Sequence, residues 1–377
     1  MNAAIETLNG DFVAAVLGGT RVIVLDSKGD LFTSDDNGQS FLLRSDTPTK
    51  FEALYSVENT VIAVSLDSQV LRSSDNGTTW TLLDTENLPD TFNGLRSVHG
   101  YAVEQGASIW MTVGHNATTD DNTSTDEFDG SRTYLSTDDG LTWSETASLS
   151  GVFIHDVIWT GSRWILSGNN LSGDGKIYYS TNGSNWLESV IPNESMSLLA
   201  LGHNGAGVVI AVGGLGEVLR SVDDGLTFTD VLDIPYSGDF RSIAVDTQGI
   251  FYLGGDEKTL LQLNGTDSSF LSNVDVQAQT LLDVILINDI LVGVGNFGTL
   301  TNRTIPLEFV ITKEGTKDFR LTLSQTLTDR VYFLETSTDL KNPWVPADTP
   351  PRLGTGSMLY FDVSKDTTKR FWRVVEQ

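Results

Sequence analysis

A short turn motif that recurs about every forty residues constrains the fold of this chain more than any other feature. Its pattern is Ser-x-Asp-x-Gly-x-Thr-Trp, and related copies lie at 34–41, 73–80, 136–143, 180–186 and 221–228. The glycines of the copies are residues 38, 77, 140, 183 and 225, so the longest gap falls before the third copy. A repeat of this length indicates units that bury their cores against one another. The longest gap indicates an insertion of roughly twenty residues in the third unit.

The residues of the motif suit a tight turn between two strands. An Asp side chain accepts backbone N–H bonds in such a turn, and Gly takes a positive φ that side chains disfavour. The Ser and Thr hydroxyls add local hydrogen bonds, and the closing Trp or Phe begins a strand with a buried ring. The motif aspartates are therefore interpreted as turn-stabilising residues, not as metal ligands or catalytic acids: Asp36, Asp75, Asp138 and Asp223.

Apolar strands joined by Gly-rich turns precede the motif, which predicts units of four antiparallel strands. The stretch 208–221 has this form, and 250–270 and 290–301 repeat it without an intact motif, so the count is seven units. Residues 4–12 resemble the strand that follows a motif, whereas the last unit stops after Thr304 without one. Pairing the two ends closes a ring and removes open edges. We predict an all-β chain with a seven-bladed β-propeller over 1–304, whose N-terminal strand closes the last blade.

A sharp change in composition after Thr304 predicts a second domain. Residues 1–304 hold 13 basic and 40 acidic side chains and 33 of the 36 glycines, whereas residues 305–377 hold 10 basic, 10 acidic and three glycines. Alternating apolar residues at 331–340 and at 370–375 are typical of half-buried strands. We predict a small fibronectin-like or immunoglobulin-like β-sandwich over 305–377.

Composition excludes several classes of protein. The net charge of −27 argues against binding to nucleic acid or to an anionic membrane surface. The chain has no Cys, which excludes disulfides, thiolate nucleophiles and Cys-ligated metals. No apolar run approaches the roughly eighteen residues that a membrane-spanning helix needs. The first residues lack the basic and apolar parts of a signal peptide, which we interpret as the mature form of a secreted, cell-surface or periplasmic protein.

The repeated motif resembles the Asp-box, also called the BNR repeat, of sialidases, xyloglucanases, sortilin-type receptors and photosystem II assembly factors. The resemblance covers 1–304 and implies the propeller fold. The unit with residues 156–164 and 178–180 is most similar to the assembly-factor and bacterial BNR branch. Residues 331–340, Trp344 and 370–375 resemble small β-sandwich domains of secreted proteins from polysaccharide-degrading bacteria, which implies secretion.

The innermost strand of each predicted blade would line a central channel. Alignment on the following turn places one residue of each unit at an equivalent position: Val13, Glu52, Arg96, His155, a residue near Leu198, Arg241 and Leu282. The polar members, Glu52, Arg96, His155 and Arg241, are the candidate ligand-binding residues for an anionic or polyhydroxylated ligand. The competing interpretation is a set of solvated channel residues that pair with one another. His155 and the adjacent Asp156 should face opposite ways and form no dyad.

The same four residues are the first candidates for catalysis, and the question of an enzyme stays open. A lyase could use His155 as base, Arg96 or Arg241 to neutralise a uronate, and a tyrosine such as Tyr101 as acid. A glycoside hydrolase needs two carboxylates at a fixed spacing, and Glu52, Asp156 and Asp283 fall on blades that are not neighbours. A sialidase is disfavoured, because its Arg-Ile-Pro start is missing and seven units exceed its usual six.

We therefore expect a secreted recognition or scaffold propeller that binds a polysaccharide or a protein across one face. The alternative is a carbohydrate-active enzyme, either a lyase or a hydrolase, acting on an acidic or sulfated polysaccharide. A third possibility, from the assembly-factor resemblance, is a factor that assembles a membrane complex.

The insertion in the third unit is the one candidate for a metal. Asp120, Asn122 and Asp126 could offer oxygen ligands to Ca²⁺, although a solvated acidic loop or a partner-contact loop explains the same residues. The four histidines, at 99, 115, 155 and 203, lack the spacing of a zinc site. No other cofactor is expected.

Overall fold

The computed structural model divides the chain into two compact units, Met1–Arg303 and Thr304–Gln377, which are described separately. The residues that it describes are 11–36, 40–45, 49–83, 94–104, 106–115, 130–192, 195–231, 234, 236–257, 259–264, 267–270, 280–287, 290–295, 299–304, 309–314, 318–323, 331–337, 345–346, 352–353, 359–364 and 371–376. Within these ranges there is no α-helix, and hence no helix that could cross a membrane. A 3-10 turn, η3, covers Gly214–Gly216.

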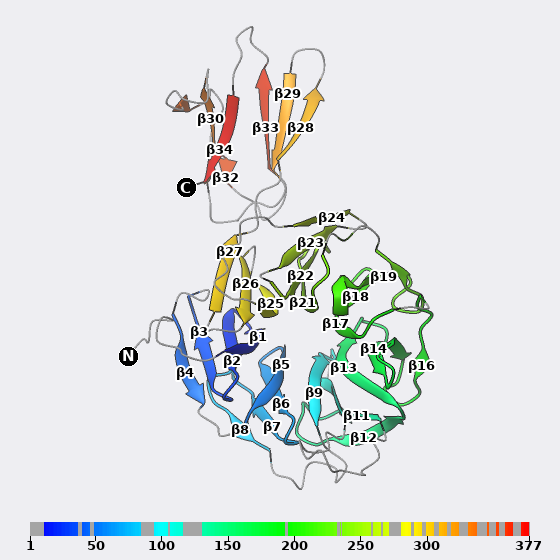
Figure 1. The fold of residues 1–377 in the computed structure, drawn as a ribbon. Helices are drawn as coiled ribbons and strands as arrows, with labels where there is room; N and C mark the ends of the chain where they lie inside the picture. The colour runs from blue at the N-terminus through cyan, green and yellow to red at the C-terminus, as the bar shows by residue number, and fades with distance from the viewer. Residues whose placement is uncertain are drawn as a thin grey trace. The chain divides into compact units, whose positions relative to one another are not determined.

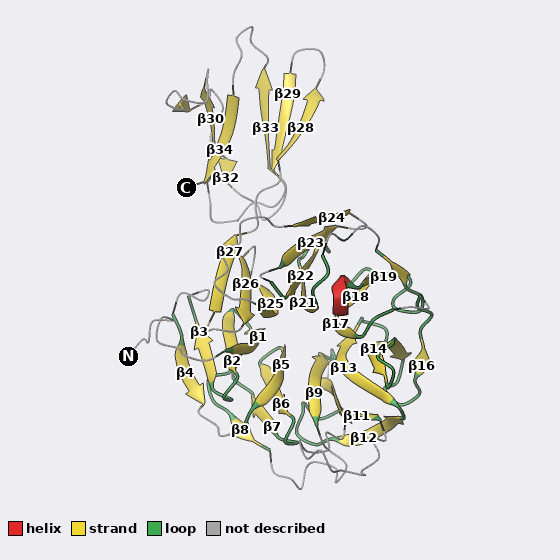
Figure 2. Ribbon diagram, in the orientation of Figure 1, coloured by secondary structure: helices red, strands yellow, loops and turns green. Residues whose placement is uncertain are grey.

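The described part of the first unit forms six four-stranded sheets and one three-stranded sheet around a central channel (Figure 1; Figure 2). The first three sheets are β1–β4 (Phe12–Gly18, Arg21–Asp26, Leu31–Ser34, Leu42–Ser45), β5–β8 (Phe51–Val57, Thr60–Ser65, Val70–Ser73, Thr81–Leu82) and β9–β12 (Leu95–Tyr101, Ile109–His115, Ser131–Ser136, Ser144–Leu149). The next are β13–β16 (Val152–Trp159, Trp164–Asn170, Gly175–Ser180, Leu187–Glu188) and β17–β20 (Leu198–His203, Val209–Gly213, Val218–Ser221, Thr229–Asp230). The last are β21–β24 (Phe240–Val245, Phe251–Gly255, Leu260–Asn264, Asp267–Phe270) and the three-stranded β25–β27 (Leu281–Ile287, Ile290–Gly295, Thr299–Thr304).

The sheets are antiparallel, and their first strands follow one another around the channel. Each first strand contacts the first strand of the next sheet, and β25 contacts both β21 and β1. The prediction of an all-β propeller is therefore confirmed. Of the segment 4–12 that was predicted to close the ring, residues 4–10 lie outside the described residues and Phe12 begins β1.

The second strand of each sheet forms the core because neighbouring sheets cover both of its faces. In β2 the residues Val22–Leu25, and in β6 the residues Val61–Val64, are completely buried. Such strands are continuously apolar instead of alternating, which is the pattern of a strand with two buried faces. The indole rings of Trp110 and Trp164 fill the same layer in the third and fourth sheets.

The recurring motif forms the turn between the third and fourth strands of its sheet, with the hydrogen bonds expected for it. In the second copy, Asp75 Oδ1 accepts the Thr79 N–H (2.8 Å) and the Ser73 hydroxyl (2.8 Å), and Asp75 Oδ2 accepts the Thr79 hydroxyl (2.7 Å). The Gly77 N–H donates back to Ser73 Oγ (2.9 Å). Asp138 and Asp223 repeat this pattern. All their carboxylate oxygens are thus used by the turn itself.

The motif glycine also joins one sheet to the next. An ideal Cβ built on Gly77, Gly140, Gly183 or Gly225 would lie 2.2–2.7 Å from a side-chain atom on the second strand of the preceding sheet. The four contacts are Gly77 with Ile23, Gly140 with Ile62, Gly183 with Met111, and Gly225 with Ile165. Because these glycines also have φ between +73° and +85°, no other residue satisfies both the turn and the contact.

Polar contacts also join neighbouring sheets at the motif turns, and we call this region of contact the seam. Arg72 of β7 donates to Asp139 Oδ2 (2.5 Å) and to the Asp139 carbonyl oxygen (2.8 Å) in the next sheet. Arg163 pairs with Asp224 in the same way (3.2 Å). Both acidic residues directly precede a motif glycine and have positive φ themselves. The seam is therefore formed by the turn motif on one side and by the preceding sheet on the other.

The second unit consists of two antiparallel sheets in its described residues. One contains β28 (Phe309–Glu314), β29 (Asp318–Leu323) and β33 (Leu359–Ser364). In the other, β30 (Val331–Ser337) pairs with β34 (Phe371–Glu376) and with the short strands β31 (Val345–Pro346) and β32 (Arg352–Leu353).

We expect Gly140→Ala to lower the free energy of unfolding by about 2–4 kcal/mol, because it adds overpacking to an unfavourable φ. Its Cβ would lie 2.2 Å from Cδ1 of the fully buried Ile62. Gly151→Ala is the matched control: Gly151 has a similar φ of +71°, but nothing lies within 4 Å of its Cβ position. The control should lose about 1–2 kcal/mol. Equal losses in denaturant unfolding would show that the contact between sheets carries no stability.

Candidate functional site

Every strand that lines the channel contains a β-bulge near its start. The pairing with the second strand skips one residue in each sheet: Val13, Glu52, Arg96, His155, Leu199, Arg241 and Leu282. A bulge re-aims the unpaired residue, so these seven side chains form one ring at a mouth of the channel. We call this end of the propeller the bulge face; the motif turns lie on the opposite face.

The bulge identifies the ring position of the fifth sheet. The fifth unit was expected to place an apolar residue near Leu198 in the ring, and Leu198 itself pairs with Gly213 and is fully buried. Leu199 is the bulged residue and is half-buried. The other six positions are those that the alignment predicted.

Glycines opposite the bulges allow the close backbone approach that the bulges need. In four sheets, a Cβ on the paired glycine would lie 1.9–2.3 Å from a carbonyl oxygen just before the bulge. The glycine and oxygen pairs are Gly168 with Phe153, Gly213 with Ser197, Gly255 with Asp239 and Gly295 with Thr280. These glycines are a sequence signal for the bulge that the motif analysis did not use.

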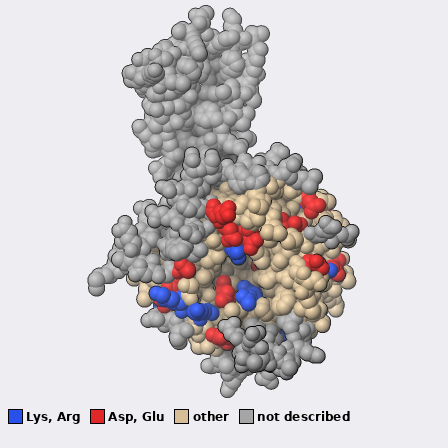
Figure 3. Space-filling model, in the orientation of Figure 1, with Lys and Arg blue, Asp and Glu red and all other residues tan. Residues whose placement is uncertain are grey.

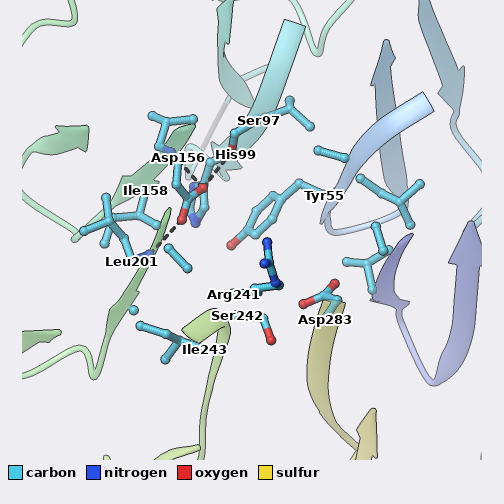
Figure 4. A pocket seen from close by; sticks show the side chains of 18 of the residues that line it. Tyr55, Ser97, His99, Asp156, Ile158, Leu201, Arg241, Ser242, Ile243 and Asp283 are labelled. Atoms are coloured by element: carbon cyan, nitrogen blue, oxygen red, sulfur yellow. Dashed lines mark hydrogen bonds between the residues drawn. The ribbon is translucent and has the colours of Figure 1, made fainter. Parts of the chain in front are cut away.

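A cavity of about 530 Å³ occupies the channel. The ring at the bulge face and the residues that follow it along each first strand line this cavity. Figure 3 shows the hollow at the centre of one face, with charged side chains of both signs around it. Figure 4 shows that Tyr55 and Arg241 point into the channel.

Arg96 is the ring cation with free hydrogen-bonding groups. Its Nε–H donates to His115 Nε2 (3.0 Å), so His115 accepts at Nε2 and is neutral. Burial, with Arg96 and His155 nearby, lowers the pKa of His115 to about 4. Among the described residues, no carboxylate lies within ion-pair distance of Arg96, and its Nη groups have no hydrogen-bond partner. They remain available to a ligand.

Glu52 and His155 lie on the strands at either side of Arg96. Burial raises the pKa of Glu52, although Arg96 and Lys50 act in the opposite direction. His155 Nε2 lies 2.7 Å from Asn169 Oδ1, which can only accept, so the imidazole donates there. Burial lowers the pKa of His155, and the histidine has no carboxylate partner among the described residues. As predicted, His155 and Asp156 form no dyad.

Arg241 is held by two carboxylates. Its Nε and Nη2 donate to Asp256 (2.8 and 3.2 Å), and Nη2 also donates to Asp239 (3.2 Å). The hydrogen bond and charge of Arg241 lower the pKa of Asp256 despite its partial burial. The two ring arginines therefore differ. Both Nη groups of Arg96 are available to a ligand, whereas the charge of Arg241 is largely neutralised by its carboxylate partners.

Asp156 and Asp283 follow bulges and connect neighbouring sheets. Asp156 accepts the Ser97 hydroxyl (2.7 Å) and the backbone N–H of Leu201 (2.8 Å), which joins the third, fourth and fifth sheets (Figure 4). Asp283 accepts the N–H of Ala15 (2.8 Å), which joins the last sheet to the first. Each also accepts the N–H of its own successor (2.8 Å). Burial raises the pKa of Asp156 to about 6 and that of Asp283 to about 7.

The far end of the channel is aromatic. Tyr55 stacks on His99 with ring centroids 3.8 Å apart, and Tyr101 stacks on Trp159 at 4.2 Å. Burial raises the pKa of Tyr55 to about 12 and lowers that of His99 to about 3, so both groups are neutral.

The structure places Tyr101 away from the other predicted lyase residues. Arg96 is the second residue of β9 and Tyr101 is the last, so about 16 Å of strand separates them. Tyr101 therefore cannot act as the acid for chemistry at Arg96 and His155. The motif aspartates lie on the opposite face from the ring and are used by their turns, as described above.

The predicted Ca²⁺ ligands Asp120, Asn122 and Asp126 lie outside the described residues. Within the described ranges, no group of three or more His, Asp or Glu side chains is placed to hold a metal ion.

The buried carboxylates generate a prediction on pH. A carboxyl group whose folded-state pKa is raised binds more protons when folded, so its contribution to stability decreases as pH rises from about 4 to about 7. The four histidines act in the opposite sense, because burial lowers their pKa values. The dependence of the free energy of unfolding on pH therefore contains contributions of both signs. The contribution of Asp283 is obtained only from the difference in stability between the wild type and a variant.

We expect the stability of the wild type relative to Asp283→Asn to fall steadily between about pH 4 and pH 7, because only the wild type must ionise a buried carboxyl. Asp75→Asn is the control. Burial acts to raise the pKa of Asp75, but the hydrogen bonds from Thr79 and Ser73 outweigh it and lower the pKa, so its contribution is lost only at lower pH. Chemical denaturation across this range measures both differences. A constant difference for Asp283→Asn would show that its carboxyl titrates normally.

Comparisons with known proteins identify the fold alone. No protein-family model and no curated protein matches the sequence. The chain is similar to the solved structure of YCF48 bound to D1 peptide, with 16% identity over 67% of this chain and 77% of that chain and a TM-score of 0.50. It is also similar to YCF48 from Cyanidioschyzon merolae (12% identity, 78% and 94% covered, TM-score 0.56) and to a streptogramin B lyase (12% identity, 80% and 95% covered, TM-score 0.61). At these identities the likeness shows a β-propeller and nothing finer.

Proposed function

We propose that this chain is a binding propeller that holds a segment of a partner protein across the mouth of the channel on the bulge face. The observation that carries the proposal is the ring of bulged residues. Seven equivalent side chains face one mouth, and the polar ones on three consecutive strands, Glu52, Arg96 and His155, include a guanidinium with free Nη groups. Such a group binds carbonyl or carboxylate oxygens of a ligand.

The surroundings of the ring favour binding over catalysis. Both carboxylate oxygens of Asp156 accept hydrogen bonds from neighbouring sheets. Asp283 accepts one such bond at Oδ2, and its Oδ1 accepts the N–H of Val284 in its own strand. His155 is fixed by an amide, and Arg241 by two carboxylates. Asp156, Asp283, His155 and Arg241 are therefore engaged in supporting the fold, whereas Arg96 remains available for recognition.

One structural neighbour supports a peptide ligand. The YCF48 structure described above holds a D1 peptide, so a propeller of this fold can bind a protein segment. A polysaccharide partner is the other ligand that the sequence suggests, and a lyase or hydrolase is the alternative activity. The alternative activity is tested by the experiment below.

The finer architecture is part of the same proposal. We propose that β25–β27 is the seventh blade, completed by the N-terminal segment that precedes β1, and that the motif makes this an Asp-box propeller. We further propose that residues 305–377 form a β-sandwich and that the protein is secreted or lies at the cell surface or in the periplasm. Support comes from the contact of β25 with β1 and from the two sheets of the second unit.

The test is selection of a random peptide library against the full chain, followed by measurement of the dissociation constants of the enriched peptides. We expect Arg96→Ala to weaken them by about tenfold, which equals about 1.4 kcal/mol, because it removes the available guanidinium. Arg44→Ala is the matched control, since Arg44 lies on the outer strand β4. It should bind as the wild type does.

Two results would contradict the proposal. In the first, enriched peptides bind Arg96→Ala and Arg44→Ala equally well. In the second, no peptide is enriched and incubation with neutral, uronate-bearing and sulfated polysaccharides yields soluble products. Mass spectrometry would then distinguish a hydrolase, whose products have gained water, from a lyase, whose products are unsaturated.

A further inference from the structure

A leucine with positive φ lies on the bulge face beside the channel mouth. Leu215, in η3, has φ +54° and ψ +31°, and its side chain is 63% exposed. The other described non-glycine residues with positive φ are all polar: Glu58, Ser68, Asn76, Asp139, Asp224 and Glu257. A bulky apolar residue is disfavoured in this conformation. Because the side chain is exposed, burial of Leu215 in the core does not explain why the strain is kept.

Fixed contacts hold the backbone around Leu215. The Leu215 N–H donates to Asp239 Oδ1 (3.2 Å), and the Gly214 N–H donates to the Ser197 carbonyl (3.0 Å). Gly216 packs so closely that a Cβ there would lie 2.1 Å from the Tyr236 carbonyl oxygen. The turn therefore holds the exposed leucine in a defined position. The carboxylate that accepts its N–H, Asp239, also binds Arg241.

Two further exposed apolar side chains belong to neighbouring segments of this face. Met196 (38% exposed) lies in the loop whose Ser197 carbonyl accepts from Gly214, and Leu171 (66% exposed) lies in the turn before Gly175. The Gly175 N–H donates to the Ser195 carbonyl (2.9 Å), so one loop connects the two segments. We call Leu171, Met196 and Leu215 the apolar ledge.

Acidic residues surround the apolar ledge. Five carboxylates belong to its segments and to the adjoining loops of the bulge face: Asp174, Glu217, Asp239, Asp256 and Glu257. The two basic side chains of these segments are already paired, Lys176 with Glu188 (2.5 Å) and Arg241 with Asp239 and Asp256. Figure 3 shows acidic side chains beside the hollow, over β21 and β22. The surface thus combines exposed apolar groups with excess negative charge.

We propose that the apolar ledge is the part of the binding face that docks a cationic, apolar segment of the partner protein, with a leucine-like side chain on Leu215 and basic side chains against the carboxylates. This inference rests on the proposed function and names the class of partner. Charge complementarity selects the occupant, because an acidic apolar segment would be repelled and a neutral one would leave the carboxylates unmatched.

The test uses three synthetic peptides of equal length, labelled for fluorescence anisotropy: one of Leu and Lys, one of Leu and Glu, and one of Ser and Lys, each with Gly spacers. A chain with a net charge of −27 attracts any basic peptide, so the variants decide the outcome. Leu215→Asn removes the apolar side chain, while Asn tolerates positive φ and should keep the melting temperature. Val222→Asn is the control, since Val222 is equally exposed (64%) in a motif turn on the opposite face. Leu171→Asn is a second ledge variant.

We expect the Leu/Lys peptide to bind most tightly, and to bind Leu215→Asn about tenfold more weakly than Val222→Asn, as for the loss of one buried leucine. Two results overturn the inference: equal binding of the Leu/Lys peptide to the Leu215, Leu171 and Val222 variants, or tighter binding of the Leu/Glu peptide. If Arg96→Ala still weakens binding in those cases, the proposed function stands and only the apolar ledge is wrong. If no variant at either site changes binding, both proposals fail.

Discussion

The contact between a motif glycine and the second strand of the preceding sheet is the interaction on which the rest of the propeller depends. It fixes the turn, because the glycine needs a positive φ, and it fixes the spacing of the first five sheets, because no Cβ fits against Ile23, Ile62, Met111 or Ile165. The regular placement of the first strands, and hence the ring of bulges at the channel mouth, follows from this spacing. The repeat of about forty residues in the sequence exists because each described motif glycine makes this contact with the sheet before it.

The sequence was informative wherever structure follows from this repeat. Glu52, Arg96, His155 and Arg241 were placed at equivalent positions by alignment on the turn that follows each strand. The bulge was not foreseen, since one unpaired residue leaves no mark in an apolar pattern. The fifth position was therefore placed only near Leu198, and the structure identifies it as Leu199. The glycines opposite the bulges, such as Gly168, carry the missing signal but resemble turn glycines in a sequence.

Partners contributed by loops could not be predicted. Asp239 and Asp256 lie two and fifteen residues from Arg241, in segments without a repeating pattern, so the neutralisation of this arginine is visible only in three dimensions. The hydrogen bond between Arg96 in β9 and His115 at the end of β10 was not predicted either. Asp156 and Asp283 were considered as catalytic carboxylates, yet each accepts a backbone N–H of a neighbouring sheet. The role of a polar residue in a channel strand, structural or functional, can therefore be assigned only when the hydrogen-bond partners of its side chain are known.

The mouth of the channel is chemically asymmetric, and this asymmetry bears on how a partner could lie there. Arg96, with its free Nη groups, belongs to the third sheet, whereas Leu215 and the carboxylates around it belong to the fifth and sixth sheets and the loops before them. A segment that crosses the mouth would meet a cation at one side and an apolar, acidic surface at the other. Reversing its direction would place its basic residues on Arg96, which like-charge repulsion disfavours. On the two proposals above, the propeller would thus select the direction of the bound chain as well as its composition.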